Sequence, residues 1–163
     1  MPTSLDWLPP LITLSDHDGK FDPFLEAVYK AFCDDFVHSK PSYDGKPFGL
    51  KKHPIELNKE ATFWHVVSQG STEADRNICL QRCERIRWPR PIIEAAMSGK
   101  VRIWKNSRRS EDRIVLAVDD FSYVVVLAER AAFVLLWTAY IVEQDHSRRQ
   151  KEYEAWNAAP KEN

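Results

Sequence analysis

Four segments in the second half of the chain are rich in β-branched, aliphatic and aromatic residues, and only short links separate them. Such residues favour strands, and strands joined by short links pair antiparallel with their neighbours in the chain. We therefore expect a curved, four-stranded antiparallel sheet. Its strands are predicted at Val101–Lys105, Arg113–Val118, Phe121–Ala128 and Ala132–Val142.

Helical patterns lie on both sides of this block. Asp22 and Pro23 are typical of a helix start, and apolar residues then recur every three or four positions. Together the strands and helices predict one α+β domain over residues 1–163, with the helices on one face of the sheet. The expected helices run from Asp22 to about Val37, from Ser71 or Thr72 to about Arg87, from Ile92 to Met97, and from Glu143 to Trp156.

The first half of the chain contains two further segments with a predicted structure. Residues 1–20 show little periodicity and are expected to form an irregular arm. Pro41–Pro54 contains prolines and glycines, which indicates a loop with a short strand around Pro47–Leu50. Ala61–Ser68 is rich in aromatic and β-branched residues and ends at Gly70, so a strand is predicted there.

Composition argues against several classes of protein. The chain contains no run of 18 apolar residues and no signal-peptide pattern at Met1, so we expect a cytoplasmic protein without a membrane partner. Cys79 and Cys83 have no second Cys/His pair at metal-binding spacing, and no glycine-rich phosphate loop is present. We therefore expect neither a metal site nor a cofactor.

Charge is distributed unevenly along the chain. Residues 76–113 contain eleven Lys or Arg against four acids, although the whole chain has a formal net charge of −1. Guanidinium groups bind phosphate oxygens in pairs, so this segment favours a polyanion, RNA above all, as a partner. The alternative is that these arginines pair with acidic residues of the same domain. The candidate RNA-binding residues are Arg82, Arg85, Arg87, Arg90 and Lys105.

Histidines and hydroxyl groups are the candidates for catalysis without a metal. Cleavage of RNA through the ribose 2′-hydroxyl needs a base, an acid and cations around the phosphate. His65 lies in the predicted strand Ala61–Ser68, and His53 lies in a loop behind two lysines. A core histidine and an ordinary surface histidine are the alternatives. In the last strand, alternation places Thr138 and Tyr140 on the face of Leu136, where they could orient a phosphate or satisfy local backbone.

A resemblance follows from residues 60–142. The segments Phe63–His65, Arg82–Pro91, Trp104 and Leu136–Tyr140 resemble the phage-type branch of the superfamily that unites barnase, EndoU, the colicin nucleases and RelE. The resemblance implies a metal-independent ribonuclease of the toxin or mobile-element effector type, with a cognate antitoxin or inhibitor protein as a possible partner. It also implies an acid/base role for His65, phosphate binding by Arg85 and Arg87, and positioning roles for Thr138 and Tyr140.

Two other hypotheses remain open beside this ribonuclease. The same basic segment suits a non-catalytic module that binds RNA or an acidic partner. It also suits a structural or regulatory protein whose arginines pair with its own acidic helices.

Overall fold

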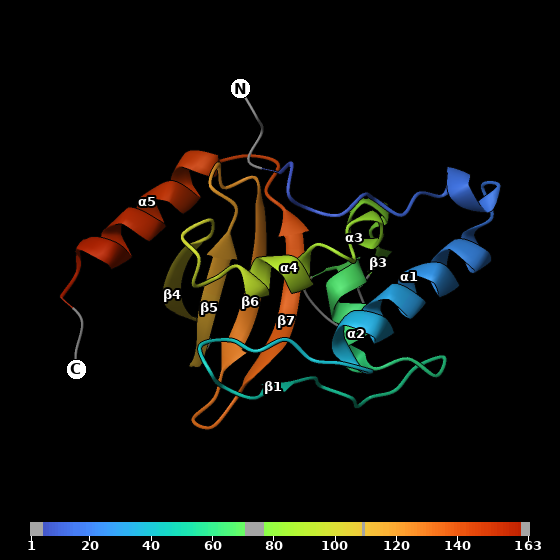
Figure 1. Ribbon diagram of the computed structural model, residues 1–163, viewed down its shortest axis with the longest axis horizontal. Helices are drawn as coiled ribbons and strands as arrows, with labels where there is room; N and C mark the ends of the chain where they lie inside the picture. Colours follow the sequence, from blue (N-terminus) through green and yellow to red (C-terminus); the bar gives the residue numbers. More distant parts are fainter. Residues whose placement is uncertain (1–4, 71–76, 109, 161–163) are drawn as a thin grey trace.

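The protein has an α+β fold in which helices cover both faces of a mixed sheet (Figure 1). The computed structural model describes residues 5–70, 77–108 and 110–160. The predicted α+β class is confirmed, but the prediction of a four-stranded antiparallel sheet is wrong. A fifth strand extends the sheet and pairs parallel with its neighbour.

The sheet has the strand order β1-β7-β6-β5-β4. Strands β4 to β7 are antiparallel neighbours, as the short links between them predict. The fifth strand, β1, is only two residues long and lies in the loop where a short strand was expected. The strands cover Phe48–Gly49 (β1), Arg102–Arg108 (β4), Glu111–Ala117 (β5), Tyr123–Glu129 (β6) and Val134–Ile141 (β7).

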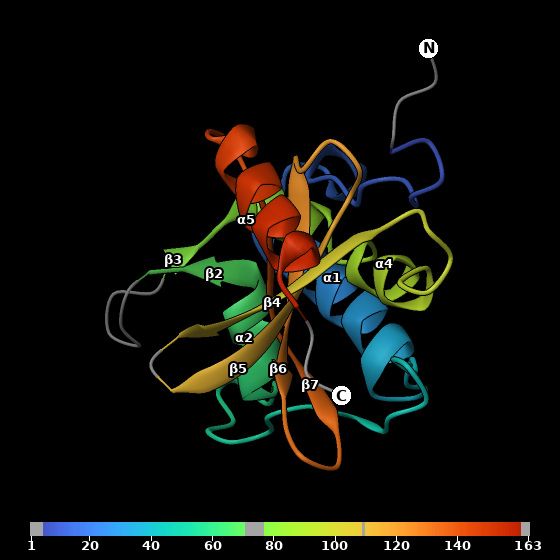
Figure 2. The same cartoon turned by 90° about the vertical axis from the view of Figure 1, so that its left-hand side faces the viewer.

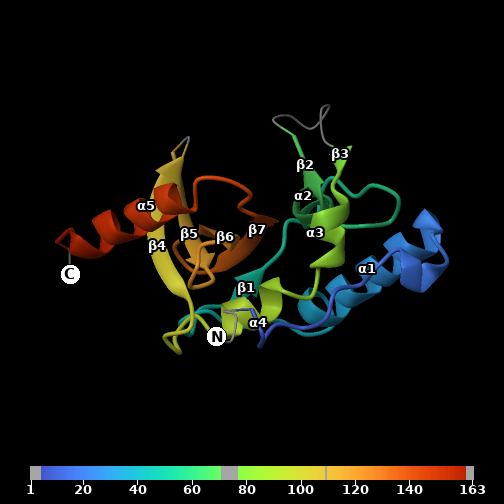
Figure 3. The same cartoon turned by 90° about the horizontal axis from the view of Figure 1, so that it is seen from above.

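The helices of the described residues lie on both faces of this sheet (Figure 3), so the expectation that they cover one face is wrong. Seen from above, α5 lies on one side of it and the other helices lie on the other side (Figure 3). A second, two-stranded sheet is formed by β2 (Ser68–Gln69) and β3 (Asn77–Ile78). The helices cover Phe21–Phe36 (α1), Ala61–Val67 (α2), Leu80–Glu84 (α3), Pro89–Glu94 (α4) and His146–Ala158 (α5).

The predicted strand at Ala61–Ser68 is wrong, because this segment forms α2. Six of its seven helical residues are buried, so its apolar pattern has no exposed face that would reveal a period. A short apolar run of this kind does not distinguish a strand from a helix. The helix is tied to the preceding loop by the Thr62 hydroxyl, which accepts a hydrogen bond from the Lys51 backbone N–H at 2.7 Å.

The helix predicted from Ser71 or Thr72 to Arg87 is shorter than expected. Its expected start lies outside the described residues, and the described part forms β3 before α3 begins at Leu80. The Cys79 backbone N–H donates to the Val67 carbonyl at 2.8 Å. Cys79 is therefore hydrogen-bonded to the end of α2 and does not lie within a helix that starts earlier.

The next helix begins earlier than predicted. Pro89 and Pro91 lie in the first turn of α4, which was expected only from Ile92. The first N–H groups of a helix have no partner within the helix, so prolines are tolerated there. The two prolines therefore start this helix and do not interrupt one.

The main hydrophobic core lies between the sheet and the helices α1, α2 and α4. Phe24 and Phe32 of α1 contact the core together with Phe63 of α2 and Leu116 of β5. The described part of the arm before α1 contains one short turn of 3-10 helix at Ser15–His17. It is packed against the core, because the Trp88 indole N–H donates to the Pro9 carbonyl at 2.8 Å.

A smaller hydrophobic cluster lies on the opposite face of the sheet. There Trp104 and Phe121 are buried beneath Tyr153 and Trp156 of α5. These two residues of α5 are three positions apart and therefore lie on one side of the helix. Figure 2 looks onto this face and shows α5 crossing the strands.

A β-bulge in β7 reverses the direction of the side chains that follow it. Val126 pairs with Thr138, but Leu127 pairs with Leu136, so Trp137 is an extra residue in the strand. The predicted faces of β7 are therefore wrong. Leu136 belongs to the main core, whereas Thr138 and Tyr140 lie on the α5 side, beside the smaller cluster.

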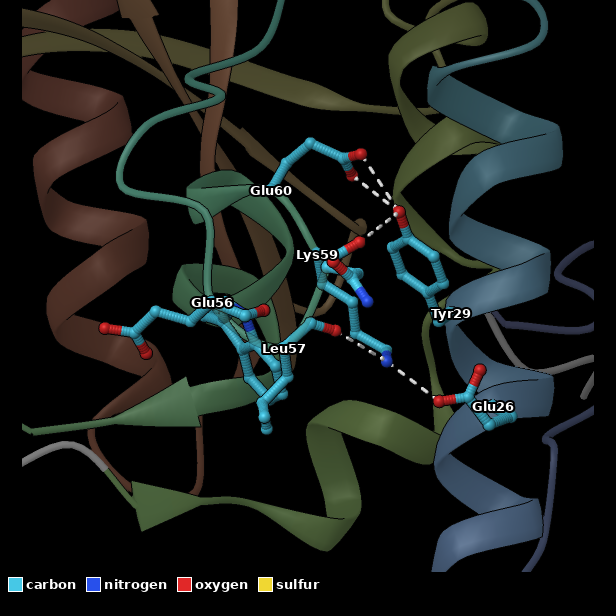
Figure 4. A network of polar contacts seen from close by, with 8 residues as sticks. Glu26, Tyr29, Glu56, Leu57, Lys59 and Glu60 are labelled. Atoms are coloured by element: carbon cyan, nitrogen blue, oxygen red, sulfur yellow. Dashed lines mark hydrogen bonds and ion pairs between the residues drawn. The ribbon is translucent and has the colours of Figure 1, made fainter.

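A polar network joins α1 to the segment that precedes α2 (Figure 4). The Tyr29 hydroxyl donates to the Glu60 carboxylate at 2.9 Å. The buried Lys59 ammonium donates to Glu26 at 2.8 Å and to the Leu57 carbonyl at 3.4 Å. Partial burial raises the pKa of the Tyr29 phenol, and the hydrogen bond to Glu60 raises it further. These contacts hold the start of α2 against α1.

Candidate functional site

Two cavities adjoin beside Tyr140, on the side of β7 that faces α5. The sheet cavity, of about 540 Å³, lies between the strands and α5. The terminal cavity, of about 580 Å³, lies at the end of β7, between α3 and the beginning of α5. Tyr140 and Arg149 line both cavities and form the boundary between them.

The two cavities differ in the chemistry of their walls. The sheet cavity is mainly cationic, whereas the terminal cavity contains three glutamines. The sheet cavity is lined by Trp104, Lys105, Asn106, Ser107, Arg113, Val115, Val126, Thr138, Tyr140, Arg148, Arg149 and Glu152. The terminal cavity is lined by Gln69, Cys79, Gln81, Arg82, Tyr140, Ile141, Val142, Glu143, Gln144 and Arg149.

Arg82 is the member of the predicted arginine cluster that reaches this site. Its guanidinium carbon lies 5.2 Å from the centre of the Tyr140 ring, a cation–π contact. The same guanidinium donates to the Thr138 hydroxyl at 3.3 Å and to the Ser68 backbone carbonyl. Three separate elements, α3, β2 and β7, therefore fix the position of this charge.

The other arginines of the cluster lie elsewhere. Arg85 donates to the Gln81 carbonyl at 3.0 Å and lies over the Trp88 ring. Arg90 contacts Glu94 and the end of α1. Arg87 is exposed and lines neither cavity. The four arginines that were candidates for RNA binding therefore do not meet on one surface, because α3 ends at Glu84 and the chain then turns.

His65 lies behind the site and not in it. Its side chain is on α2 and its ring centre lies 5.5 Å from that of Trp137. Only 9% of the residue is exposed, and it lines neither cavity. Its backbone carbonyl accepts a hydrogen bond from the Thr138 hydroxyl at 3.3 Å. His53 is an exposed loop residue that also lines neither cavity.

Lys105 lines the sheet cavity, but its ammonium group is paired with Glu129, which is not part of the cavity wall. Its ammonium lies 3.0 Å from the Glu129 carboxylate, which also contacts Lys46 at 3.2 Å. Partial burial raises the pKa of Glu129, but the hydrogen bonds and charges of the two lysines outweigh this effect and lower it overall. Glu129 therefore stays ionised and holds Lys105, which makes this lysine a weak candidate for binding phosphate.

Arg113, Arg148 and Arg149 were not singled out from the sequence, yet they line the sheet cavity. The Arg113 guanidinium lies 5.3 Å from the centre of the Trp137 ring, and so projects from β5 across to β7. Arg148 and Arg149 lie 3.7 and 3.9 Å from the Glu152 carboxylate. Arg148 is exposed and Arg149 is half-buried, and ion pairs as long as these in contact with solvent contribute little to stability. They therefore leave both arginines able to bind an anion.

The aromatic residues of α5 were the signal that could have revealed these arginines. Tyr153 and Trp156 recur at helical spacing in an otherwise charged segment. They bind α5 to the sheet and so bring the preceding turn of the helix over the cavities. Strand alternation, by contrast, identified Thr138 and Tyr140 as neighbours, and both do line the sheet cavity.

The site combines positive charge with hydroxyl groups. Guanidinium groups from α3, β5 and α5 line the two cavities that meet at Tyr140, and the Thr138 hydroxyl lies in the same wall as Tyr140. Among the described residues, no three His, Cys, Asp or Glu side chains come together as a metal site. Within the same part of the chain, none of the helices combines the length and apolar character needed to cross a bilayer.

No family model, curated protein or solved structure matches this chain.

Proposed function

We propose that this protein is a metal-independent endoribonuclease that binds single-stranded RNA along the two cavities and cuts it through the ribose 2′-hydroxyl. The observation that carries the proposal is that Arg82 and Arg149 meet at the hydroxyl-bearing side chain of Tyr140, with Arg113 in the wall of the same sheet cavity. These residues come from four different elements and meet along one concave surface.

Charge supports the assignment of a phosphodiester as the ligand. Four arginines line the two cavities, against the acids Glu143 and Glu152. Guanidinium groups bind phosphate oxygens in a forked geometry, and arginine is the side chain that suits this recognition best. An RNA strand lying past Tyr140 would place a phosphate between Arg82 and Arg149.

The chemistry needs a proton acceptor, a proton donor and positive charge at the phosphorus. The ribose 2′-oxygen loses its proton and bonds to the phosphorus while the bond to the 5′-oxygen breaks. The products are a cyclic phosphate and a 5′-hydroxyl. We assign proton transfer to the Tyr140 hydroxyl, which takes the proton of the 2′-oxygen while it gives its own proton to the departing 5′-oxygen. We assign stabilisation of the phosphorane to Arg82 and Arg149. Thr138 and the backbone of His65 are positioning groups, because they hold Arg82 in place.

The test is RNA cleavage in the presence of EDTA. We expect a single-stranded RNA to be cut, leaving a cyclic phosphate at the new end. The same sequence with 2′-O-methyl groups should stay intact. Cutting of the methylated strand would show that the 2′-hydroxyl is not the nucleophile and would reject the proposed mechanism.

The second candidate is a non-catalytic module that binds RNA or an acidic partner through the same arginines. The observation that favours it is the position of His65, since none of the described histidines lines either cavity. Salt-sensitive RNA binding without any cutting over a long incubation would support this candidate against the first.

The proposal also includes a biological setting. An endoribonuclease of this kind acts on cytoplasmic RNA and is toxic to its host unless an inhibitor protein covers the site. Induced expression in a bacterial host is therefore expected to stop growth, and Tyr140→Phe to relieve the arrest. Growth arrest that persists unchanged in this variant would separate toxicity from cleavage at Tyr140.

A further inference from the structure

The terminal cavity differs from a simple phosphate site in the side chains that line it. The chain contains four glutamines, and three of them, Gln69, Gln81 and Gln144, line this one cavity. They come from β2, α3 and the link between β7 and α5, which are separate in the sequence. A gathering of amide groups from three elements places both donors and acceptors around one space.

We propose that the terminal cavity is a base-recognition subsite for one nucleotide of the bound strand, with adenine as the preferred base. This inference rests on the proposed binding of RNA at the same groove. Sequence-specific recognition of RNA occurs at single-stranded bases, whose edges accept hydrogen bonds from side chains and whose faces stack on aromatic or guanidinium groups.

The lining of the cavity suits a base better than a phosphate. A phosphate only accepts hydrogen bonds, and the Glu143 carboxylate in the wall would repel it. A base carries donors as well, which the Glu143 carboxylate and the glutamine carbonyls can accept. Ile141 and Val142 supply apolar surface beside these polar groups, as small-molecule sites generally do.

The preference for adenine follows from the donor and acceptor pattern. A glutamine amide pairs with the amino group and N7 of adenine through two hydrogen bonds. A carboxylate such as Glu143 also accepts from an exocyclic amino group. Uracil carries a carbonyl oxygen where adenine carries its amino group. The Glu143 carboxylate would repel this oxygen, because both groups are negatively charged or partly so.

The position of the cavity links the base to the phosphate. The wall of the terminal cavity nearest the sheet cavity consists of Arg82, Tyr140 and Arg149. Arg82 and Arg149 are also the proposed phosphate ligands, and Tyr140 is the proposed proton-transfer group. A nucleotide with its base among the glutamines would therefore have its phosphate at Arg82 and Arg149. The base in the terminal cavity then selects which phosphodiester lies at Tyr140.

The experiment uses the full chain and a pool of short RNAs of random sequence. The pool is incubated with the protein in EDTA, and the new ends are sequenced. We expect adenine to exceed uracil about tenfold at one position next to the cut, because a bidentate contact of this kind gives discrimination of that order. Gln81→Ala and Gln144→Ala should each reduce this ratio severalfold, because they slow cutting next to adenine more than cutting next to uracil.

The matched control is Gln150→Ala. Gln150 is the fourth glutamine, lies exposed on α5, bonds to Glu154 at 3.0 Å and lines neither cavity. This variant should keep the wild-type base ratio. Equal use of the four bases by the wild type would overturn the subsite, and so would an unchanged ratio in both cavity variants.

A binding measurement separates this inference from the proposed function. Fluorescence anisotropy compares short oligoadenylate with oligouridylate and requires no cutting. Adenine-selective binding that Gln81→Ala weakens, without cleavage, would retain the subsite and reject the ribonuclease. Cutting without any base preference would retain the ribonuclease and reject the subsite.

Discussion

The Arg82 guanidinium donates a hydrogen bond to the Thr138 hydroxyl at 3.3 Å, and so joins α3 to the centre of β7. The same hydroxyl donates to the His65 carbonyl at 3.3 Å. The Thr138 hydroxyl thus accepts a hydrogen bond from α3 and donates one to α2. This hydroxyl group therefore helps to fix the charge beside Tyr140, together with the Ser68 carbonyl.

Replacing this hydroxyl tests its structural role. We expect Thr138→Val to lower the free energy of unfolding by about 1–2 kcal/mol, because it leaves Arg82 and the His65 carbonyl each without one partner. Thr138→Ser keeps the hydroxyl and should lose less than half of that. Urea denaturation followed by circular dichroism measures both. Equal losses in the two variants would mean that the methyl group, and not the hydroxyl, matters at this position.

The role of Tyr140 is tested by removing its oxygen alone. We expect Tyr140→Phe to slow RNA cutting by at least about a hundredfold, in keeping with the usual contribution of a proton-transfer group. RNA affinity should be retained because the ring and Arg82 remain. Tyr153→Phe, in the hydrophobic cluster under α5, is the matched control and should cut RNA at the wild-type rate. Wild-type cutting by Tyr140→Phe would exclude the assigned role.

His65 provides the opposite test, because the sequence alone favours it as the acid or base. We expect His65→Gln to reduce stability but to keep RNA cutting within about tenfold of the wild type, since a residue that does not touch the substrate transfers no proton to it. Rates are compared at a temperature where circular dichroism shows the variant to be folded. A loss of a hundredfold or more in the folded variant would place the imidazole in the reaction and contradict the geometry described above.

Salt dependence tests which arginines meet phosphate. We expect Arg149→Ala to weaken RNA binding and to reduce the slope of log affinity against log salt by about 0.7, the value for one phosphate contact on a single strand. Arg87→Ala removes the same charge from an exposed position away from both cavities. It should leave the slope unchanged. If the two variants lower the slope equally, binding follows overall charge and not this groove.

Alkaline pH tests the buried thiol of Cys83. Burial raises its pKa to about 12, whereas an unfolded cysteine has a pKa of about 8.5. The unfolded chain therefore releases this proton first. The stabilisation is complete below about pH 8.5 and is lost as pH rises toward 12, with about 2 kcal/mol lost by pH 10. Urea denaturation between pH 8 and 10 should show a shallower decline for Cys83→Ala than for the wild type or for Cys79→Ala. Parallel curves would show that the decline has another source.

The sheet was predictable from the sequence because its strands are long and their chain neighbours are also their neighbours in space. The strand that contains Val124, Val125 and Val126 pairs with the strands that precede and follow it in the chain. A short-range sequence pattern is enough to find such strands. The segment Ala61–Val67 was not predictable in this way. Its residues are buried on nearly all sides, so its conformation depends on tertiary contacts such as that of Phe63 with Phe32 of α1 and that of Thr62 with the Lys51 backbone.

Part of the site was predictable because two of its residues are close together in the sequence. Thr138 and Tyr140 are two residues apart in one strand, so alternation places them together. Their meeting with Arg82 and Arg149 depends on the packing of α3 and α5 against the sheet. No local pattern contains that information. Arg85, Arg87 and Arg90 do not join Arg82 at the site, because α3 ends at Glu84 and the path of the chain after it is set by tertiary packing.

The bulge in β7 determines which deletions the groove would tolerate. Deleting Trp137 would restore plain alternation, in which Leu136 still faces the main core while Thr138 and Tyr140 still face α5. Deleting Ala139, which is regularly paired, would instead place Tyr140 opposite Val125 and turn its hydroxyl toward the main core. Two deletions of equal length, two residues apart, would thus have opposite consequences for the groove.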